Sequence, residues 1–476
     1  MCVGLLRRLR RCALLAALLL AGCATSTPLP PPPRELSCPR QAPAPPLIPL
    51  QRAEHLLASF WLDRMPEPER PLLDSAAIAA LNQRAFRLAP PSSVIARVDL
   101  LRSKTRFPRQ RLERDLQRLA RAIDQGKRLF AGGQRPKRLV ATLQQRLAAT
   151  QPSEELRVAL RSTPLRCYAD HRALYEERGD RAFDLAQCAE LRFGEAVRVL
   201  GKGPRYWYVQ AAYGGGWVDR RALSPALSSE QARRYLRWED MAMIVADRVG
   251  VWSSARGGKL LGIARLGLSL PRLSGAEADR DGVVVRVIGS RGPQRGFIRE
   301  RRAVARADQP LTRAALVERA FRLLHTPYGW GGTGGKRDCS RLLMDLFASF
   351  GVLLPRNSKQ QSKSGSERID VTKLSDAAKA KAIERAARRG LVLLFLPGHI
   401  MLYLGRDGDH LYALHQFSGY LTPCPGGGET MQRVNHTTVT ALELGRGSSR
   451  RAFIERITKL IVFGSPPSPQ GSESSR

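Results

Sequence analysis

Apolar residues recur every third or fourth position across residues 53–162, as at Leu116, Leu119 and Ile123, with Arg and Gln between them. This spacing is typical of amphipathic helices that bury one face. The segment shows no grouping of side chains that would carry out chemistry. We therefore predict that residues 53–162 form a helical N-terminal domain that acts as a stabilising scaffold.

From Cys167 the pattern changes to short runs in which apolar and polar residues alternate. Residues 193–200 and 206–209 alternate in this way and are separated by a glycine turn, and a looser second copy follows over 263–298. Such runs predict short β-strands. The Gly216-Trp217-Val218 ending resembles bacterial SH3 domains, which implies two small SH3-like β-barrels at residues 163–232 and 233–307.

Helical and strand patterns alternate from residue 308 to residue 463. We expect helices at 311–324 and 339–350 and strands at 390–397 and 400–404. The low-complexity stretch 464–476 is predicted to be a disordered tail. We therefore predict that the whole chain is a multidomain α+β protein.

The first residues have the pattern of an export signal. Basic residues at 7–11 precede a short apolar run and Leu20-Ala21-Gly22-Cys23, and the run is too short to span a bilayer. The four residues resemble a bacterial lipobox, which implies a signal peptide at 1–22 and lipidation of Cys23; an ordinary signal peptide is the alternative. A Pro-rich tether at 23–52 follows, and Ala24 implies sorting to the outer membrane, facing the periplasm.

Net charge limits the classes of binding partner, and the number of cysteines indicates whether a thiol is free. The 476 residues include 78 basic and 42 acidic side chains, a net charge of +36, which by itself favours nucleic acid or an anionic surface. Export makes nucleic acid a poor candidate, so we expect the membrane, through the N-terminal lipid, and acidic wall peptides instead. Five cysteines remain after the signal and Cys23, and this odd number indicates a free thiol. Whether Cys167 and Cys188 pair stays open.

Cys339 is the candidate for that free thiol. It follows a loop of five glycines between 329 and 335, and Asp338 before it is a good helix N-cap. The helix dipole is expected to lower the pKa of a thiol in the first turn.

Two histidines complete the candidate triad. His399 begins one predicted strand and His415 ends the next, so a hairpin turning at 406–409 brings them together. Cys339, His399 and His415 are predicted to be nucleophile, general base and orienting residue. The spacing of His, Cys and Asp residues favours no metal site, and no cofactor is expected.

Four short sequence motifs support this interpretation. They are Tyr328-Gly329-Trp330-Gly331-Gly332, Asp338-Cys339-Ser340, Leu354-Pro355-Arg356-Asn357-Ser358-Lys359-Gln360 and Gly398-His399-Ile400-Met401-Leu402-Tyr403-Leu404-Gly405. Together these motifs resemble the NlpC/P60 family of cell-wall cysteine peptidases. The resemblance covers about residues 310–462. It implies a papain-like catalytic domain that hydrolyses peptidoglycan stem peptides or muropeptides, commonly at the bond between γ-D-glutamate and meso-diaminopimelate.

The domain order is similar to that of the dipeptidyl-peptidase VI subgroup, which acts on peptides with a free N-terminal L-Ala. The resemblance implies substrate contacts from both the peptidase and the first SH3-like domain, namely Tyr328, Asp338, Ser340, Arg356 and Tyr213. An acidic contact is also implied, with Glu176, Glu177 and Asp184 as open candidates. The extra Gly/Pro-rich stretch 421–435 is a candidate lid.

Two alternatives remain open at this point. In the first, the chain is a catalytically inactive scaffold that binds the envelope. In the second, the same triad serves an amidase or acyltransferase. We expect a monomer in each case.

Overall fold

A computed structural model describes residues 48–87, 99–130, 136–176, 180–237, 239–273, 282–306 and 309–464. The predicted signal peptide, Cys23, nearly all of the tether and the tail after residue 464 lie outside these ranges. Within them, no helix has both the length and the apolar character needed to cross a membrane.

The described residues form a mixture of helices and strands in the following order. The helices, including 3₁₀ turns marked η, are η1 (Ala53–Leu56), α2 (Ala58–Leu62), α3 (Ser75–Arg87), α4 (Arg109–Asp124), α5 (Pro136–Ala148), η2 (Arg220–Ala222), α6 (Ser229–Leu236), η3 (Arg301–Ala303), α7 (Arg313–Phe321), η4 (Trp330–Gly335), α8 (Cys339–Ala348), α9 (Ser358–Gln361), α10 (Asp376–Arg389) and α11 (Phe453–Arg456). The strands are β1 (Arg128–Phe130), β2 (Gln151–Val158), β3 (Thr163–Arg166), β4 (Leu174–Glu176), β5 (Gln187–Leu191), β6 (Ala196–Lys202), β7 (Tyr206–Ala211), β8 (Gly214–Asp219), β9 (Met241–Ile244), β10 (Arg248–Trp252), β11 (Leu260–Arg265), β12 (Ser269–Pro271), β13 (Val283–Gly289), β14 (Gly292–Ile298), β15 (Val304–Arg306), β16 (Glu367–Asp370), β17 (Leu391–Leu396), β18 (His399–Asp407), β19 (His410–Pro423), β20 (Glu429–Ala441) and β21 (Lys459–Phe463).

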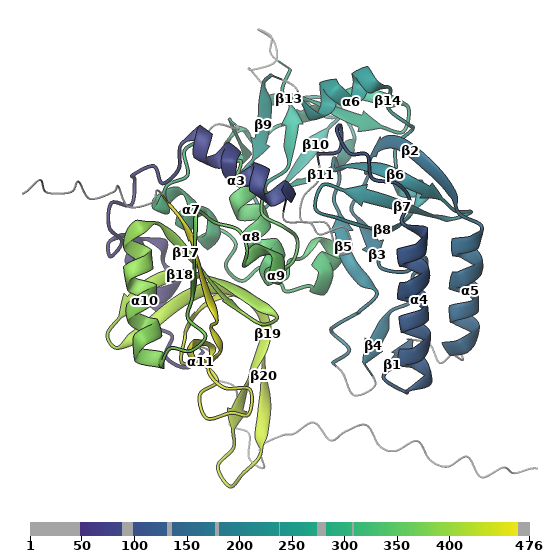
Figure 1. Ribbon diagram of the computed structural model, residues 1–476. Coiled ribbons are helices and arrows are strands. Elements are labelled where there is room, and N and C mark those ends of the chain that lie inside the picture. The colour runs from purple at the N-terminus through teal and green to yellow at the C-terminus, as the bar shows by residue number, and fades with distance from the viewer. Residues whose placement is uncertain are drawn as a thin grey trace, which may run out of the picture.

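The N-terminal helices pack in two different places. Helices α4 and α5 lie side by side against the first β-sheet, where Leu116 and Leu143 share a core with Trp217 (Figure 1). Helices α2 and α3 instead pack on the C-terminal domain, where Trp61 is fully buried. Strand β2 falls inside the range 53–162 that was predicted to be helical, and it pairs with β6 of the first sheet.

Residues 151–306 form the β-rich middle of the chain, in which strands β2 to β8 make up the first β unit and strands β9 to β15 the second. The first sheet has six strands in the order β2-β6-β7-β8-β3-β5, and two smaller sheets follow with the orders β11-β10-β14-β13 and β12-β9-β15. The short strands agree with the alternating sequence pattern. Over the described residues these sheets do not close into barrels, so the two SH3-like barrels stay a prediction.

The C-terminal domain is a six-stranded antiparallel sheet with helices on both faces. Its strand order is β16-β21-β17-β18-β19-β20. One face buries Leu343 and Phe347 of α8, and the other buries Ile383 of α10. This layering places the first residue of α8 beside the start of β18, and these two points carry Cys339 and His399.

Strands β19 and β20 extend beyond the sheet as a long hairpin (Figure 1). The stretch 421–435, predicted to be an insertion, is the outer end of this hairpin, where Pro423 pairs with Glu429. Arg433 on β20 forms an ion pair with Asp180, which precedes β5 of the first β unit. The hairpin therefore contacts the segment that precedes β5.

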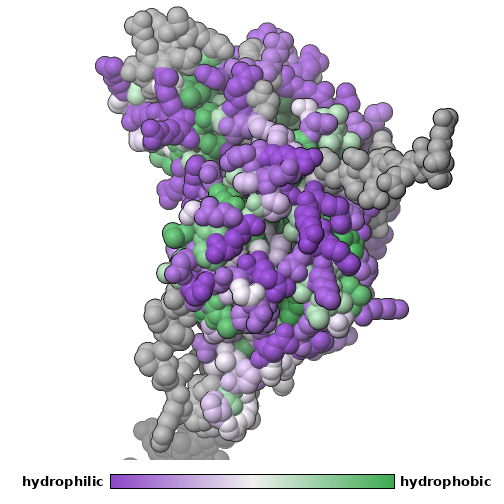
Figure 2. Space-filling view, turned by 90° about the vertical axis from the view of Figure 1, so that its left-hand side faces the viewer, coloured by the Kyte–Doolittle hydropathy of each residue, from purple (hydrophilic) through white to green (hydrophobic). Residues whose placement is uncertain are grey.

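Hydrophilic side chains cover most of the face shown in Figure 2. Among the described residues, the large hydrophobic side chains that are markedly exposed are Leu50, Leu57, Leu260 and Leu374.

Candidate active site

The glycine-rich loop before Cys339 lies against strand β5. Gly331 has a φ of 63°, and a Cβ atom there would stand 2.6 Å from Cγ of Gln187. Gly335 donates its backbone N–H to the carboxylate of Glu190 at 2.9 Å. Glycine at position 331 is therefore required both by its left-handed backbone and by the close approach of β5.

Cys339 is the first residue of α8 and lines the cleft in a partly exposed position. Asp338 caps the helix by accepting the backbone N–H of Arg341 at 2.8 Å. Cys339 is the one free cysteine of the described part of the chain, because Cys167 pairs with Cys188 and Cys424 is also disulfide-bonded. Cys38 lies outside the described residues.

The pKa of Cys339 differs in direction from the sequence-based prediction. Burial and then the negative charge of Asp338 raise the pKa of the thiol to about 12, although backbone N–H groups of Ile400 and Ser340 act in the opposite direction. The prediction that the helix start lowers this pKa was wrong, because desolvation and the neighbouring carboxylate outweigh the helix dipole. With its pKa raised in this way, the sulfur is a neutral thiol at pH 7.

The two predicted histidines lie next to each other. Nε2 of His399 is 2.7 Å from Nδ1 of His415, and Nε2 of His415 is 2.9 Å from the hydroxyl oxygen of Thr440. The His415 ring also stacks on Phe417 with ring centroids 4.3 Å apart. His415 is thus fixed from three directions, and His399 keeps only Nδ1 for other contacts.

The tautomers of the two rings determine whether Nδ1 of His399 is a free base. If Nε2–H of His415 donates to Thr440, Nδ1 of His415 accepts the Nε2–H of His399, and Nδ1 of His399 is a free base. The opposite direction of donation would protonate Nδ1 of His399 and remove that base. The hydroxyl of Thr440 is the acceptor in the first of these two arrangements.

Both rings are held in the neutral form. Burial, and then the positive charge of Arg456, lower the pKa of His399 to about 3. Burial and the His399 ring lower the pKa of His415 well below its ordinary value. A neutral imidazole and a neutral thiol therefore line the same cleft, which suits proton abstraction during attack rather than a preformed ion pair.

The three predicted polar contacts beside the thiol form one cluster. Arg356 donates to both carboxylate oxygens of Asp338, at 3.0 and 2.7 Å, and to the hydroxyl of Ser340 at 3.0 Å. Burial opposes ionisation of Asp338, but Arg356 nevertheless lowers its pKa. Asp338 is an anion that a substrate cation would have to share with Arg356.

The two predicted tyrosines both line the cleft. The hydroxyl of Tyr213 donates to the backbone carbonyl of Glu190 at 2.8 Å and also contacts the carboxylate of Glu195. Tyr328 has a pKa raised by burial and by its proximity to Cys339. Each tyrosine therefore stays protonated and can serve only as a hydrogen-bonding or packing group.

The acidic candidates of the first β unit lie elsewhere. Asp184 pairs with Arg166 at 2.6 Å, and Glu176 ends β4 at the surface, so neither lines the cleft. Glu177 lies outside the described residues. Glu190, which sequence reasoning missed, touches the glycine loop instead of the substrate space.

Comparison with known proteins identifies the part of the chain that contains this site. Residues 325–438 match the family described as NlpC/P60. These residues form an NlpC/P60 domain. No curated protein matches the chain.

Solved structures extend the likeness beyond the NlpC/P60 domain. An NlpC/P60 endopeptidase from Photobacterium damselae subsp. piscicida aligns with 86% of this chain and 97% of its own, at 14% identity and a TM-score of 0.68. This likeness shows a shared fold. An NlpC/P60 protein from Bacillus cereus aligns over 58% of this chain and 82% of its own, with 18% identity and a TM-score of 0.42. The peptidoglycan hydrolase RipB from Mycobacterium tuberculosis aligns over 26% and 61%, with 24% identity and a TM-score of 0.16.

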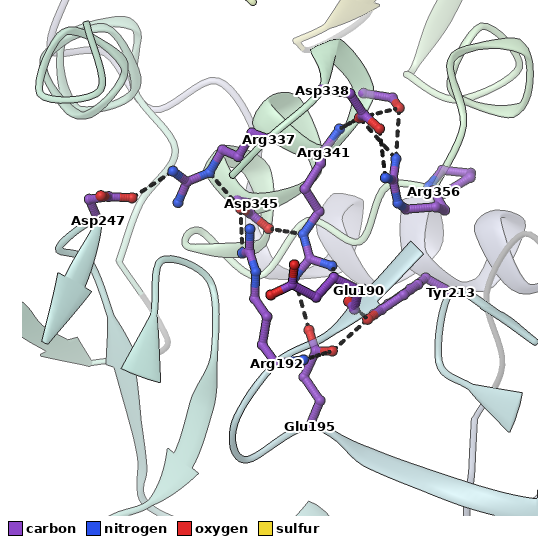
Figure 3. Close-up of polar contacts among 12 residues, drawn as sticks. Glu190, Arg192, Glu195, Tyr213, Asp247, Arg337, Asp338, Arg341, Asp345 and Arg356 are labelled. Atoms are coloured by element: carbon purple, nitrogen blue, oxygen red, sulfur yellow. Dashed lines mark hydrogen bonds and ion pairs between the residues drawn. The ribbon is translucent and has the colours of Figure 1, made fainter. Parts of the chain in front are cut away.

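A buried ionic network joins the NlpC/P60 domain to both β units (Figure 3). Asp345 of α8 accepts from three arginines, Arg192 at 2.6 Å and Arg337 and Arg341 at 2.7 Å. Arg192 belongs to the first β unit, and Arg337 also reaches Asp247 of the second at 2.5 Å. The network fixes α8, and with it Cys339, against the rest of the molecule.

The cleft above the thiol has a volume of about 600 Å³. Its charged lining consists of five arginines and one carboxylate, Asp338; the arginines are Arg111, Arg356, Arg450, Arg451 and Arg456. Within the described residues, no group of three His, Cys, Asp or Glu side chains is arranged to hold a metal ion. The charge of the cleft therefore favours an anionic ligand.

Sequence reasoning missed three groups of the site. They are Thr440, the backbone N–H of Ile400 and Arg456. Thr440 lies near His415 because β19 and β20 pair, and Arg456 lies in the segment after β20. Both positions depend on tertiary contacts, so local sequence motifs could not predict them.

Proposed function

We propose that the chain is a cysteine endopeptidase of the cell envelope that hydrolyses the bond between γ-D-glutamate and a diamino acid, meso-diaminopimelate, in stem peptides or muropeptides. The single observation that carries the proposal is the chain from Thr440 through His415 to His399, which ends at the cleft beside Cys339. Membership of residues 325–438 in the NlpC/P60 family supports it.

The reaction begins with a neutral pair. As Sγ of Cys339 bonds to the γ-carbonyl carbon, its proton passes to Nδ1 of His399, and the negative charge moves to the carbonyl oxygen. The tetrahedral intermediate then collapses, the C–N bond breaks, and His399 returns the proton to the leaving amine. A thioester remains on Cys339.

Water completes the cycle by the same route. His399 takes a proton from water as the water oxygen attacks the thioester carbon, and the C–S bond then breaks. The sulfur regains a proton, and the γ-carboxylate of the released peptide is free. Thr440 and His415 hold His399 in the required tautomer through both halves.

The acyl side of the substrate fits the cluster around Asp338. We infer that Asp338 receives the ammonium of a free N-terminal L-Ala, while Ser340 and Arg356 contact its peptide, with Tyr213 and Tyr328 closing the wall. We further propose that the two β units are SH3-like modules that form this wall. A lipid on Cys23, which would hold the enzyme at the outer membrane, belongs to the same proposal.

Purified L-Ala-γ-D-Glu-meso-diaminopimelate tests the proposal, with products followed by mass spectrometry. The wild type should release L-Ala-γ-D-Glu, Cys339→Ala should release none, and a substrate acetylated on L-Ala should react more slowly. Ser362→Ala is a matched control, because this small buried side chain lies outside the cleft. Turnover by Cys339→Ala would refute the mechanism, and binding without turnover by the wild type would favour the scaffold alternative.

A further inference from the structure

Three of the five cleft arginines come from one short segment after β20. Arg450, Arg451 and Arg456 lie between Gly445 and the end of α11. The segment is tied down, because the backbone N–H of Ala452 donates to Glu455 at 2.6 Å and the hydroxyl of Ser449 donates to Glu429 at 2.6 Å. The cations are therefore presented by an ordered turn.

Arg456 lies beside the catalytic histidine. The His399 ring stacks on Phe453 with centroids 5.8 Å apart, and the guanidinium of Arg456 lies 5.0 Å from the same Phe453 ring. The charge of Arg456 also depresses the pKa of His399. Because His399 donates the proton to the leaving amine, the space around Phe453 and Arg456 belongs to the leaving amino acid.

Neither Arg450 nor Arg456 forms an ion pair among the described residues, and Glu429 and Glu455 act on them only at longer range. Arg451, in contrast, lies 3.6 Å from Glu455. The Nε–H of Arg456 donates to the carbonyl of Ala452 at 3.3 Å, and its terminal nitrogens are left for other groups. Arg356, the cation nearest the acyl side, is already occupied by Asp338.

We propose that Arg450 and Arg456 form a subsite for the carboxylates of the leaving amino acid. The proposal rests on the proposed function and specifies its substrate class, a diamino acid that carries a free carboxylate on the leaving side. A guanidinium binds a carboxylate through two parallel N–H bonds, and such charged hydrogen bonds are among the strongest in proteins. Meso-diaminopimelate offers such groups, whereas an amidated residue does not.

A series of three substrates tests the subsite in the full chain. They share L-Ala-γ-D-Glu and differ in the leaving residue: meso-diaminopimelate has two free carboxylates, L-lysine has one and L-lysinamide has none. We expect kcat/KM of the wild type to fall at each step. In Arg456→Gln and Arg450→Gln, kcat/KM should fall about tenfold or more on the diaminopimelate substrate and little on the lysinamide substrate. The difference in kcat/KM between the three substrates should therefore become smaller.

Two controls keep the outcomes distinct. Arg446→Gln removes an arginine of the same segment that pairs with Asp376 outside the cleft, and it should keep the wild-type series. Arg456→Lys retains the charge and should recover part of the preference. Equal losses on all three substrates in Arg456→Gln, or a flat series in the wild type, would overturn the subsite. Failure of the wild type on every substrate would instead refute the proposed function and the subsite with it.

Discussion

Replacing Asp345 by asparagine tests how strongly the buried network holds the molecule together. Asp345 is 2% exposed and accepts hydrogen bonds from Arg192, Arg337 and Arg341. Asparagine keeps the shape but removes the charge that compensates three guanidinium groups. Breaking a buried ion pair costs about 3–5 kcal/mol, so we expect Asp345→Asn to lose at least about 3 kcal/mol of unfolding free energy.

The measurement is urea unfolding followed by both far-ultraviolet circular dichroism and tryptophan fluorescence. A second measurement is the melting temperature. It changes by about 2–4 °C per kcal/mol for domains of 150–250 residues, so the melting temperature of Asp345→Asn should be lower by about 6 °C or more. Because Asp345 joins Arg192 of the first β unit to Arg337 and Arg341 of its own domain, the two probes should also cease to coincide in Asp345→Asn.

Asp115→Asn is the matched control. Asp115 also lies on a helix and pairs with two arginines, Arg111 and Arg118, but at 3.7 and 3.5 Å on a side chain that is 38% exposed. A surface pair of this kind contributes about 0–1 kcal/mol. If Asp345→Asn lowered the unfolding free energy no more than Asp115→Asn, the buried ion pairs would not stabilise the fold. The reasoning from burial would then be refuted.

Three further predictions concern the site itself. Gly331→Ala should destabilise the protein by about 2 kcal/mol more than Gly334→Ala, since both glycines have positive φ but only the first would clash, with Gln187; equal melting temperatures would contradict this. Thr440→Val should lower kcat about fivefold and Thr440→Ser should restore it; a change in KM alone would argue against a tautomer role. The raised pKa of Cys339 means less thiolate at any given pH, so iodoacetamide should alkylate Cys339 in the folded chain more slowly at pH 7 than in the urea-unfolded chain; a rate that is already maximal at pH 7 would refute the neutral-thiol state.

The sequence was most informative where function depends on neighbours along the chain. The glycine loop, the Asp338 cap and the strand positions of His399 and His415 are local patterns, and the structure brings these residues together. The mixed helix and strand composition followed from periodicity in the same way. The closure of the β units into barrels is not seen in the described residues, because alternation predicts strands without fixing how a sheet ends.

The remaining features depend on contacts between distant residues. Arg192 and Asp345 are 153 positions apart, and no periodicity relates them. The pKa of Cys339 depends on how deeply the helix start is buried, which the helix-capping pattern does not encode. Thr440 reaches His415 only because β19 and β20 pair in one particular register.

The shared charges at Asp345 limit how this protein can be rearranged during evolution. An NlpC/P60 domain transplanted without its β units would leave behind Arg192 and Asp247, so Arg337 and Asp345 would each lose a partner. Gene fusion could exchange freely only those modules whose interfaces lack such buried ions. The NlpC/P60 domain and its two β units are thus expected to be inherited as one block.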